Sequence, residues 1–180
     1  MAILAVFHND YTQIGVYSKV IRYVLNPEKA KYTGSVNIYR EDELDAIAEQ
    51  MIEMTIAYGV LGGQLLRHFS LSFDTLKTEA WVTPEIAYQI GNLICQKILY
   101  RHQVVFGVHI DAEHVHIHFV VNAVDYQGNK FIDKQSTYKQ LAKDIKRLPV
   151  QTDAGNSRIY CDLVYRNNPT YTNETADKSR

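Results

Sequence analysis

The sequence of 180 residues predicts an α/β sandwich with a mainly antiparallel sheet. Helix-like and strand-like segments are interspersed along the chain, and two strand-like segments between residues 103 and 124 adjoin with no helix between them. Adjoining strands pair as an antiparallel hairpin, whereas a doubly wound parallel sheet needs a crossover connection after each strand. The length suits one domain that buries a core of its own.

The first half of the chain is expected to contain three strands and two helices. The strands are residues 2–7, 35–39 and 65–73, the last with Phe69, Leu71 and Phe73 on one side. The helices are residues 15–26, ended by Asn26-Pro27, and 42–58, where apolar residues recur at helical spacing. These assignments rest on the periods of 2 and 3.6 residues that strands and helices impose on buried positions.

The second half begins with a helix that carries a start signal, Thr83 as the cap and Pro84 at the first position. The clearest strands come next, at residues 103–110 and 114–124, then a turn at Gly128, a helix at 136–147 and a last strand at 157–165. Residues 167–180 are polar and read as a tail or the start of a linker, so the folded domain is expected to span residues 1–166.

Composition excludes few partners. The formal net charge of −1 is mildly unfavourable for a nucleic-acid-binding protein, but residues 19–31 form a locally basic segment that would suffice. No apolar stretch approaches the roughly 20 residues of a membrane helix, so no membrane insertion is expected. The two cysteines lie far apart and fit a reducing cytosol, which favours a cytoplasmic location.

The stretch HIDAEHVHIHFVVN, residues 109–122, holds four of the seven histidines. A hairpin with a tight turn near residues 112–113 sets His109 opposite His116, Gly107 opposite His118 and Asp111 opposite His114. Because strand side chains alternate, all four histidines and Asp111 then share one face, and an apolar row takes the other. One side of the hairpin is therefore expected to be core and the other a cluster of imidazoles.

A divalent metal accepts the lone pairs of clustered neutral imidazoles, and the ligand set suits Mn²⁺, Zn²⁺, Co²⁺ or Ni²⁺. Three neutral ligands leave the ion's charge uncompensated, which favours an anionic substrate such as a phosphate. Gly107 is expected to leave space beside His118 for a substrate oxygen. Two alternatives stay open: strand histidines without any ligand, and a structural zinc site, which usually contains cysteines.

Four segments resemble, in order and spacing, the motifs of the mobilisation relaxases, the MobA-type branch of the HUH endonucleases. The histidine stretch is similar to the third motif, with His116-Ile117-His118 as the HUH itself. The others are RYVLNPEKA (22–30) for the first motif, RHFSLSF (67–73) for the second, and VTPEIAYQIG (82–91) for the helix after the second motif. Together they span residues 22 to about 130.

The resemblance implies a central sheet of about five strands with the histidine hairpin in the middle. It also implies an enzyme that nicks one DNA strand at a transfer origin: a tyrosine attacks the phosphodiester and leaves a covalent 5′-phosphotyrosine and a free 3′-hydroxyl. A divalent ion assists, with Mn²⁺ or Mg²⁺ expected in function and Zn²⁺, Co²⁺ or Ni²⁺ as alternatives. Residue by residue, the ligands would be His109, His116 and His118, and the nucleophile Tyr23, with Tyr17 and Tyr11 behind it.

Further residues are expected to assist catalysis or to bind DNA around the predicted metal ligands and Tyr23. Asp111 could orient a ligand imidazole or take the tyrosine's proton, and Glu113 is either a second catalytic acid or a solvated turn residue. Contacts to DNA are expected from Lys19, Arg22, His68, Ser72, His114 and Asn122. Several of these can also be read as ordinary strand residues. The implied partners are single-stranded origin DNA beside a DNA hairpin, accessory mobilisation proteins and a coupling protein, with the chain acting as a monomer.

Other functions remain open at this stage. A rolling-circle replication initiator or a transposase of the same superfamily would use similar chemistry. A metal hydrolase would use bound water with no covalent step, and a non-catalytic module would bind metal and DNA without cutting. Residues after about 148 do not resemble the segment that family members carry after the third motif, so their contribution to DNA specificity is open.

Overall fold

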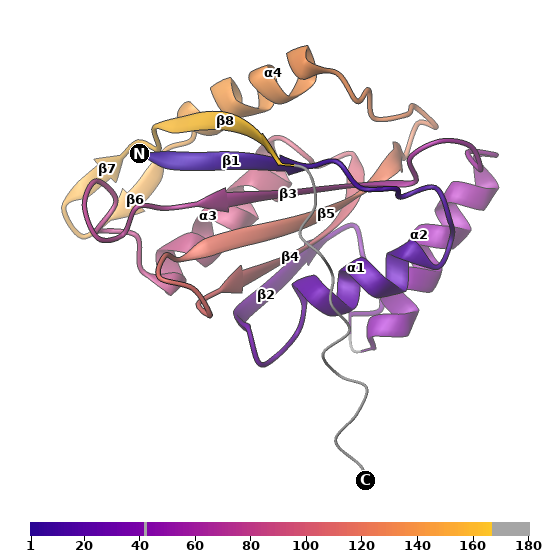
Figure 1. Cartoon of the computed structure of the whole chain (residues 1–180), viewed down its shortest axis with the longest axis horizontal. Helices are drawn as coiled ribbons and strands as arrows, with labels where there is room; N and C mark the ends of the chain where they lie inside the picture. Colours follow the sequence, from indigo (N-terminus) through magenta and orange to yellow (C-terminus); the bar gives the residue numbers. More distant parts are fainter. Residues whose placement is uncertain (42, 167–180) are drawn as a thin grey trace, which may run out of the picture.

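The computed structural model describes residues 1–41 and 43–166. Four helices and a central sheet form three layers, with α1 and α2 on one face of the sheet and α3 and α4 on the other (Figure 1). The helices are α1 (Val16–Val24), α2 (Leu44–Ala57), α3 (Pro84–Lys97) and α4 (Gln135–Lys146). The strands are β1 (Ala2–Phe7), β2 (Ala30–Val36), β3 (Leu66–Ser72), β4 (His102–His109), β5 (His116–Asp125), β6 (Val150–Thr152), β7 (Gly155–Ser157) and β8 (Cys161–Arg166).

The main sheet has six strands in the order β2-β4-β5-β3-β1-β8. Four of its five neighbouring pairs are antiparallel and the β1–β8 pair is parallel. The predicted α/β class with a mainly antiparallel sheet is therefore confirmed, with β8 at the edge raising the strand number above the expected five. The β4–β5 hairpin lies at the centre (Figure 1), as the resemblance implied.

Local signals account for the start of α3 and for the turn at Gly128. The Thr83 hydroxyl accepts a hydrogen bond from the backbone N–H of Ile86 at 3.3 Å, so α3 begins at Pro84 as its cap predicts. Gly128 adopts φ 78°, the left-handed turn expected there. Residues 167–180, the predicted polar tail, lie outside the described residues.

Two predicted strands needed correction. The strand expected at residues 35–39 lies earlier, as β2, because Asn37 adopts φ 60° and its side-chain amide donates to the carbonyls of Tyr100 and His102, which ends the pairing with β4. The strand expected at 157–165 is shared between two elements: Ser157 closes the small β6–β7 hairpin, and β8 begins only at Cys161.

The two faces of the sheet differ in how far they are covered. On one face, α3 and α4 bury the apolar row of the hairpin along its whole length, and this row includes Val108, Ile117 and Phe119. On the other face, α1 and α2 pack over Val105 and Val120. The histidines of the same face lie further along the strands, towards the turn of the hairpin. The site is therefore a polar extension of a half-covered sheet face.

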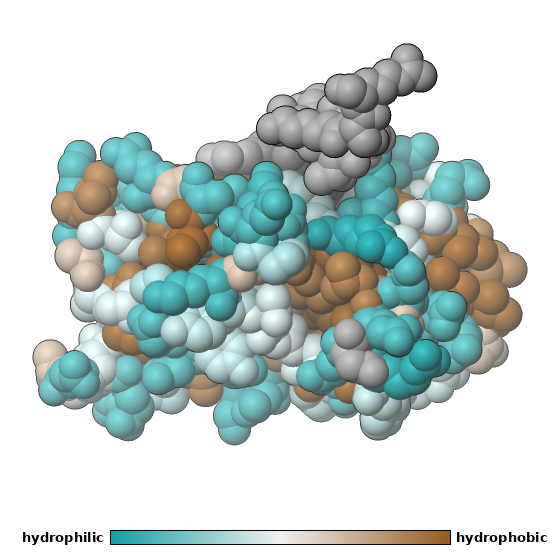
Figure 2. All heavy atoms as spheres, turned by 90° about the horizontal axis from the view of Figure 1, so that it is seen from below, coloured by the Kyte–Doolittle hydropathy of each residue, from teal (hydrophilic) through white to brown (hydrophobic). Residues whose placement is uncertain are grey.

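None of the helices in the described part of the chain has the length and apolarity to span a bilayer. Seen from below the view of Figure 1, the surface is mostly polar, with separate apolar areas between polar side chains (Figure 2).

Candidate functional site

The β4–β5 hairpin brings three histidines together in the expected register. His109 pairs with His116, and Gly107 pairs with His118. The ring centroids lie 4.7 Å apart for His109 and His118, 5.0 Å for His116 and His118, and 5.4 Å for His109 and His116. One ligand-capable nitrogen from each ring lies within 4.8 Å of the others. The alternation of the sequence therefore predicted this cluster correctly.

Hydrogen bonds to backbone carbonyls identify which nitrogens are available. His109 Nε2 lies 2.8 Å from the carbonyl oxygen of Val24, and His116 Nδ1 lies 2.9 Å from that of His114. A carbonyl only accepts, so each of these nitrogens carries the proton and donates. The lone pairs of a neutral ring are then on Nδ1 of His109 and Nε2 of His116. His109 Nδ1 is buried and has no hydrogen-bond partner among the described residues.

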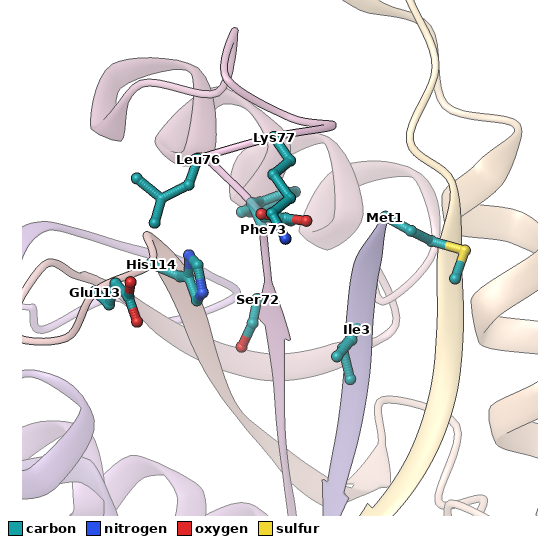
Figure 3. Close-up of a pocket in the computed structure, with 9 residues that line it drawn as sticks. Met1, Ile3, Ser72, Phe73, Leu76, Lys77, Glu113 and His114 are labelled. Carbon is teal, nitrogen blue, oxygen red and sulfur yellow. The ribbon is translucent and has the colours of Figure 1, made fainter.

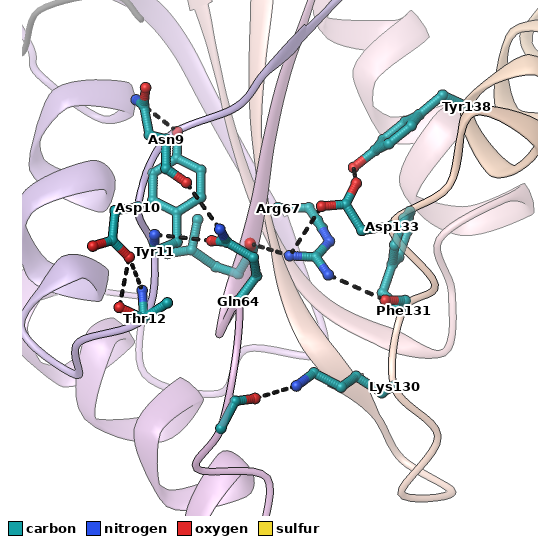
Figure 4. Close-up of polar contacts among 12 residues, drawn as sticks. Asn9, Asp10, Tyr11, Thr12, Gln64, Arg67, Lys130, Phe131, Asp133 and Tyr138 are labelled. Carbon is teal, nitrogen blue, oxygen red and sulfur yellow. Dashed lines mark hydrogen bonds and ion pairs between the residues drawn. The ribbon is translucent and has the colours of Figure 1, made fainter. Parts of the chain in front are cut away.

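The third ring is held by another histidine. His118 Nδ1 lies 3.0 Å from Nε2 of His68, whose Nδ1 in turn lies 3.4 Å from the hydroxyl of Tyr11. When His118 donates through Nδ1, its Nε2 lone pair becomes available on the side of the other two rings. Asn9 donates to the Tyr11 hydroxyl at 3.1 Å, and Gln64 accepts from the Tyr11 backbone N–H, which fixes this segment (Figure 4).

Burial keeps these rings uncharged near neutral pH. It lowers the pKa of His118 well below 6.5, lowers that of His68 to about 3, and lowers that of His109, with neighbouring histidines adding to the effect. Neutral imidazole is the form that ligates metals. The unpartnered buried nitrogen of His109 and the convergence of the three rings fit a divalent cation held by His109, His116 and His118.

Tyr23 lies beside this cluster. Its ring centroid is 5.4 Å from that of His118, 5.8 Å from His109 and 6.1 Å from His68. Burial raises the pKa of Tyr23 above 10, and the Asp111 carboxylate raises it further. A nearby cation would oppose both effects, because it favours the phenolate.

The two alternative tyrosines are enclosed. Tyr17 is completely buried; its hydroxyl donates to the Leu65 carbonyl and contacts Thr55, and burial raises its pKa to about 12. Tyr11 is 2% exposed and lies behind His68. Of the three candidates, Tyr23 combines partial exposure with ring contacts to His109 and His118. These two histidines and His116 are called the triad below.

Lys29 is a site residue that the sequence reasoning missed. Its ammonium lies 5.4 Å from the centre of the Tyr23 ring and 3.7 Å from Asp111 Oδ2. The signal was its place in the first motif and in the basic segment 19–31. Asp111 Oδ1 lies 3.9 Å from His109 Nδ1 and 3.8 Å from His116 Nε2, which is beyond hydrogen-bond distance. The carboxylate therefore borders the triad, while Glu113 is exposed in the turn.

Gly107 has a different role from the one expected. A Cβ atom there would collide with the carbonyl oxygen of Val24, so α1 already occupies the space reserved for a substrate oxygen. This close approach allows the Val24 carbonyl to reach His109, and it places Tyr23, one residue earlier, over the histidines.

The residues expected to contact DNA divide into two groups. His68 is 1% exposed and Asn122 is completely buried, so neither offers a DNA contact in this structure. The Asn122 amide donates to the Met51 carbonyl and to Gln103, and its oxygen lies 3.0 Å from the Tyr17 hydroxyl, because α1 and α2 cover this part of the strand.

The other four expected DNA contacts are more accessible. Lys19 and Arg22 are exposed on α1, although Arg22 already donates to Asp45 at 2.6 Å. Ser72 is half-buried and pairs with His116 across β3 and β5. His114 is half-buried, and its Nδ1 has no hydrogen-bond partner among the described residues. Ser72 and His114 therefore lie next to the three histidines, whereas Lys19 and Arg22 lie on α1, and all four stay predictions as DNA contacts.

Residues 23–152 match the model of the family described as relaxase, MobA/VirD2-like, nuclease domain. The chain belongs to this family. The matched range begins at Tyr23 and includes the entire histidine hairpin. The domain is thus a relaxase nuclease domain of the MobA/VirD2-like family.

Individual relatives agree with the family. The relaxase domain is 38% identical over 66 residues to a Staphylococcus aureus protein named Rlx, and 37% identical over 62 residues to a second Rlx protein of that species. These segments are 37% and 34% of the chain but only 19% and 20% of the relatives. The chain therefore spans about a fifth of the length of the curated relatives it matches.

A solved structure shares the fold of the relaxase domain. It was reported under the heading "Molecular Basis of Vancomycin Resistance Transfer in Staphylococcus aureus". The TM-score is 0.54 with 10% sequence identity, over 80% of this chain and 88% of the other. At that identity the likeness shows the fold alone.

Proposed function

We propose that the chain is a metal-dependent, strand-specific nickase that cuts single-stranded DNA at a transfer origin, with Tyr23 as nucleophile, for conjugative mobilisation of a plasmid or integrative element. The position of the Tyr23 ring, 5.4 Å and 5.8 Å from the rings of His118 and His109, carries the proposal. This position supports Tyr23 as a nucleophile acting beside a phosphate-binding cation. Residues 1–166 would form the nuclease domain.

The reaction is a transesterification. The Tyr23 oxygen loses its proton and bonds to phosphorus, the bond between phosphorus and the 3′-oxygen breaks, and the 3′-oxygen takes up a proton. The products are a 5′-phosphotyrosine and a free 3′-hydroxyl. One phosphodiester replaces another, so the reverse attack by a 3′-hydroxyl can reseal a strand.

The chain's own residues prepare this step. Asp111, next to the triad and close to Tyr23, is suited to take the phenol proton or to orient His109 and His116. Lys29, whose ammonium lies 5.4 Å from the centre of the Tyr23 ring, is suited to attract the incoming phosphate. A divalent cation at the three histidines, Mn²⁺ or Mg²⁺ with Zn²⁺, Co²⁺ or Ni²⁺ as alternatives, would supply charge stabilisation to the non-bridging phosphate oxygens.

Covalent attachment tests the proposal. Single-stranded fragments from the genetic element that carries the gene are incubated with the protein and Mn²⁺, and then run on a denaturing protein gel. A slower, DNA-containing band should form, disappear with a chelator and be absent in Tyr23→Phe. Tyr39→Phe is the control, because Tyr39 is 84% exposed and outside the site. A band that survives Tyr23→Phe contradicts the assignment.

The same gel separates the other functions. DNA cleavage without a covalent band, persisting in Tyr23→Phe, would indicate a metal hydrolase that uses water, and DNA binding without cleavage a non-catalytic module. Attachment only to fragments from a replication origin or a transposon end would indicate a replication initiator or a transposase. A DNA hairpin beside the nick, accessory mobilisation proteins and a coupling protein belong to the same proposal and require the native origin.

A further inference from the structure

A cavity opens next to the triad on the same face of the sheet. His109, His116, Ser72 and Ile3 occupy paired positions on four neighbouring strands and form one row across the sheet. Beyond His116 this row enters a pocket of about 330 Å³ between the hairpin turn, β1 and the loop after β3 (Figure 3). The lining includes Ile3, Ser72, Phe73, Leu76, Lys77 and His114.

The walls of the pocket combine apolar and polar groups. Ile3, Phe73 and Leu76 supply apolar surface, and Leu76 is 62% exposed at the rim (Figure 3). The polar part of the lining comprises the Ser72 hydroxyl, the His114 ring and the charged residues Asp74, Lys77 and Glu113. Small-molecule sites have this character, mostly apolar with a few polar groups, and range from about 300 to 1,000 Å³. The pocket is at the lower end, so it suits a small flat ligand.

We propose that this pocket receives one nucleobase of the single-stranded DNA, from a nucleotide adjacent to the phosphate held at the triad. The inference rests on the proposed function. Neighbouring strands are about 4.8 Å apart, so the pocket starts a single strand beyond His116, within reach of the next base along the DNA. Stacking against apolar and ring side chains binds single-stranded bases, and the polar edge of a base can meet Ser72 and His114.

This assignment accounts for His114, the hairpin histidine that lies outside the metal triad. Its Nδ1 has no hydrogen-bond partner within the described part of the chain, and its ring faces the pocket next to Ser72 (Figure 3). A bound base would cover the ring and Leu76 together. Base recognition and phosphate binding would then use opposite ends of one hairpin turn.

A base-by-base scan tests the pocket. A single-stranded 12-nucleotide probe is selected from a random pool for binding to the full chain with a chelator present, so that no cleavage interferes. Each nucleotide is then replaced in turn by an abasic one, and binding is measured by fluorescence anisotropy. One position should lose affinity on the order of tenfold, as expected for a stacked base. In Leu76→Ala and in His114→Ala that loss should shrink to less than twofold, with the other positions unchanged.

Leu61→Ala is the matched control, since Leu61 is 57% exposed on a different loop, and its scan should equal that of the wild type. If the scans of Leu76→Ala and His114→Ala both equal that of the wild type, the proposal is overturned. A chain that binds no probe would also overturn it. Free deoxynucleoside monophosphates that bind as tightly as the probe would assign the pocket to free nucleotides instead.

The outcome is separable from the covalent assay. A covalent adduct through Tyr23 together with unchanged scans in the pocket variants would reject the base-binding pocket and support the nickase. Altered scans without an adduct keep the pocket as a DNA-binding feature and remove the nickase.

Discussion

Replacing His68 by phenylalanine should weaken metal binding at the triad by about 10- to 100-fold, the usual effect of losing a partner that holds a metal-ligating histidine. His68 Nε2 lies 3.0 Å from His118 Nδ1. In the tautomer that leaves the Nε2 lone pair of His118 available to a metal, His118 Nδ1 donates and His68 Nε2 accepts. Phenylalanine fills a similar volume but accepts no hydrogen bond. His68 is therefore a positioning residue in this reasoning.

The magnitude depends on burial. His118 is 4% exposed and His68 1%, so water cannot readily replace the lost acceptor. Leaving a buried N–H unsatisfied costs about 1–3 kcal/mol. If His118 avoids that cost by moving its proton to Nε2, it withdraws a ligand lone pair. Each 1.4 kcal/mol is tenfold in affinity, so the range corresponds to about 5- to 150-fold.

Isothermal titration calorimetry with Mn²⁺ measures the affinity, and the absorption of bound Co²⁺ reports the ligand geometry. His68→Gln should recover part of the affinity, because its side-chain oxygen can accept from His118. His102→Phe removes a histidine outside the site and should leave metal binding unchanged. Circular dichroism verifies that each variant is folded. A folded His68→Phe protein with wild-type affinity would refute the idea that His68 selects the available nitrogen of His118.

Four further outcomes are expected. Gly107→Ala should destabilise the fold by about 1–3 kcal/mol in urea titrations and reduce adduct formation, because the new methyl group displaces α1; unchanged values would contradict the close approach. Lys29→Ala should reduce the slope of log affinity for single-stranded DNA against log salt concentration by about 0.7, which corresponds to one phosphate contact. Lys31→Ala should change this slope less, because the Lys31 ammonium lies 3.3 Å from a glutamate oxygen. Equal slopes in the two variants would exclude a specific role for Lys29. Asn122→Ala should cost at least about 2 kcal/mol of stability through its buried hydrogen bonds, with the affinity of the remaining folded protein for DNA preserved. With metal removed, the free energy of unfolding should fall as the pH drops from about 6.5 towards 3. Burial lowers the pKa of His68 in the folded chain to about 3, so the unfolded chain binds the proton first. Urea unfolding at pH 7 and pH 5 measures the difference, and equal stabilities would contradict this prediction.

The hairpin could be predicted from sequence because its information is local. Strict alternation places His109, His116 and His118 on one face and Ile117 and Phe119 on the other, and one register keeps the apolar row buried. The expected tight turn at residues 112–113 is instead a loop over residues 110–115, which leaves Asp111 and His114 outside the strand pairing. Tyr23 required the family resemblance, because nothing in its neighbourhood distinguishes it from other tyrosines.

The roles expected for Gly107, Asn122 and His68 did not allow for the packing of α1 and α2. Periodicity shows that a helix is amphipathic, but it does not show how far along a sheet the helix lies. Gly107 and Asn122 received functional roles because the sequence does not reveal that these helices cover them. His68 was assigned to DNA for the same reason, and the contact between its ring and His118 arises only when β3 pairs with β5.

The hydrogen bond between His109 and the Val24 carbonyl joins the two halves of the site mechanically. The residue that accepts it comes directly after Tyr23, so the His109 imidazole is anchored to the helix that carries Tyr23. If Tyr23 attacks DNA as proposed, strain on α1 from a bound strand would reach both Tyr23 and His109 through this single contact, which spans 85 residues of sequence.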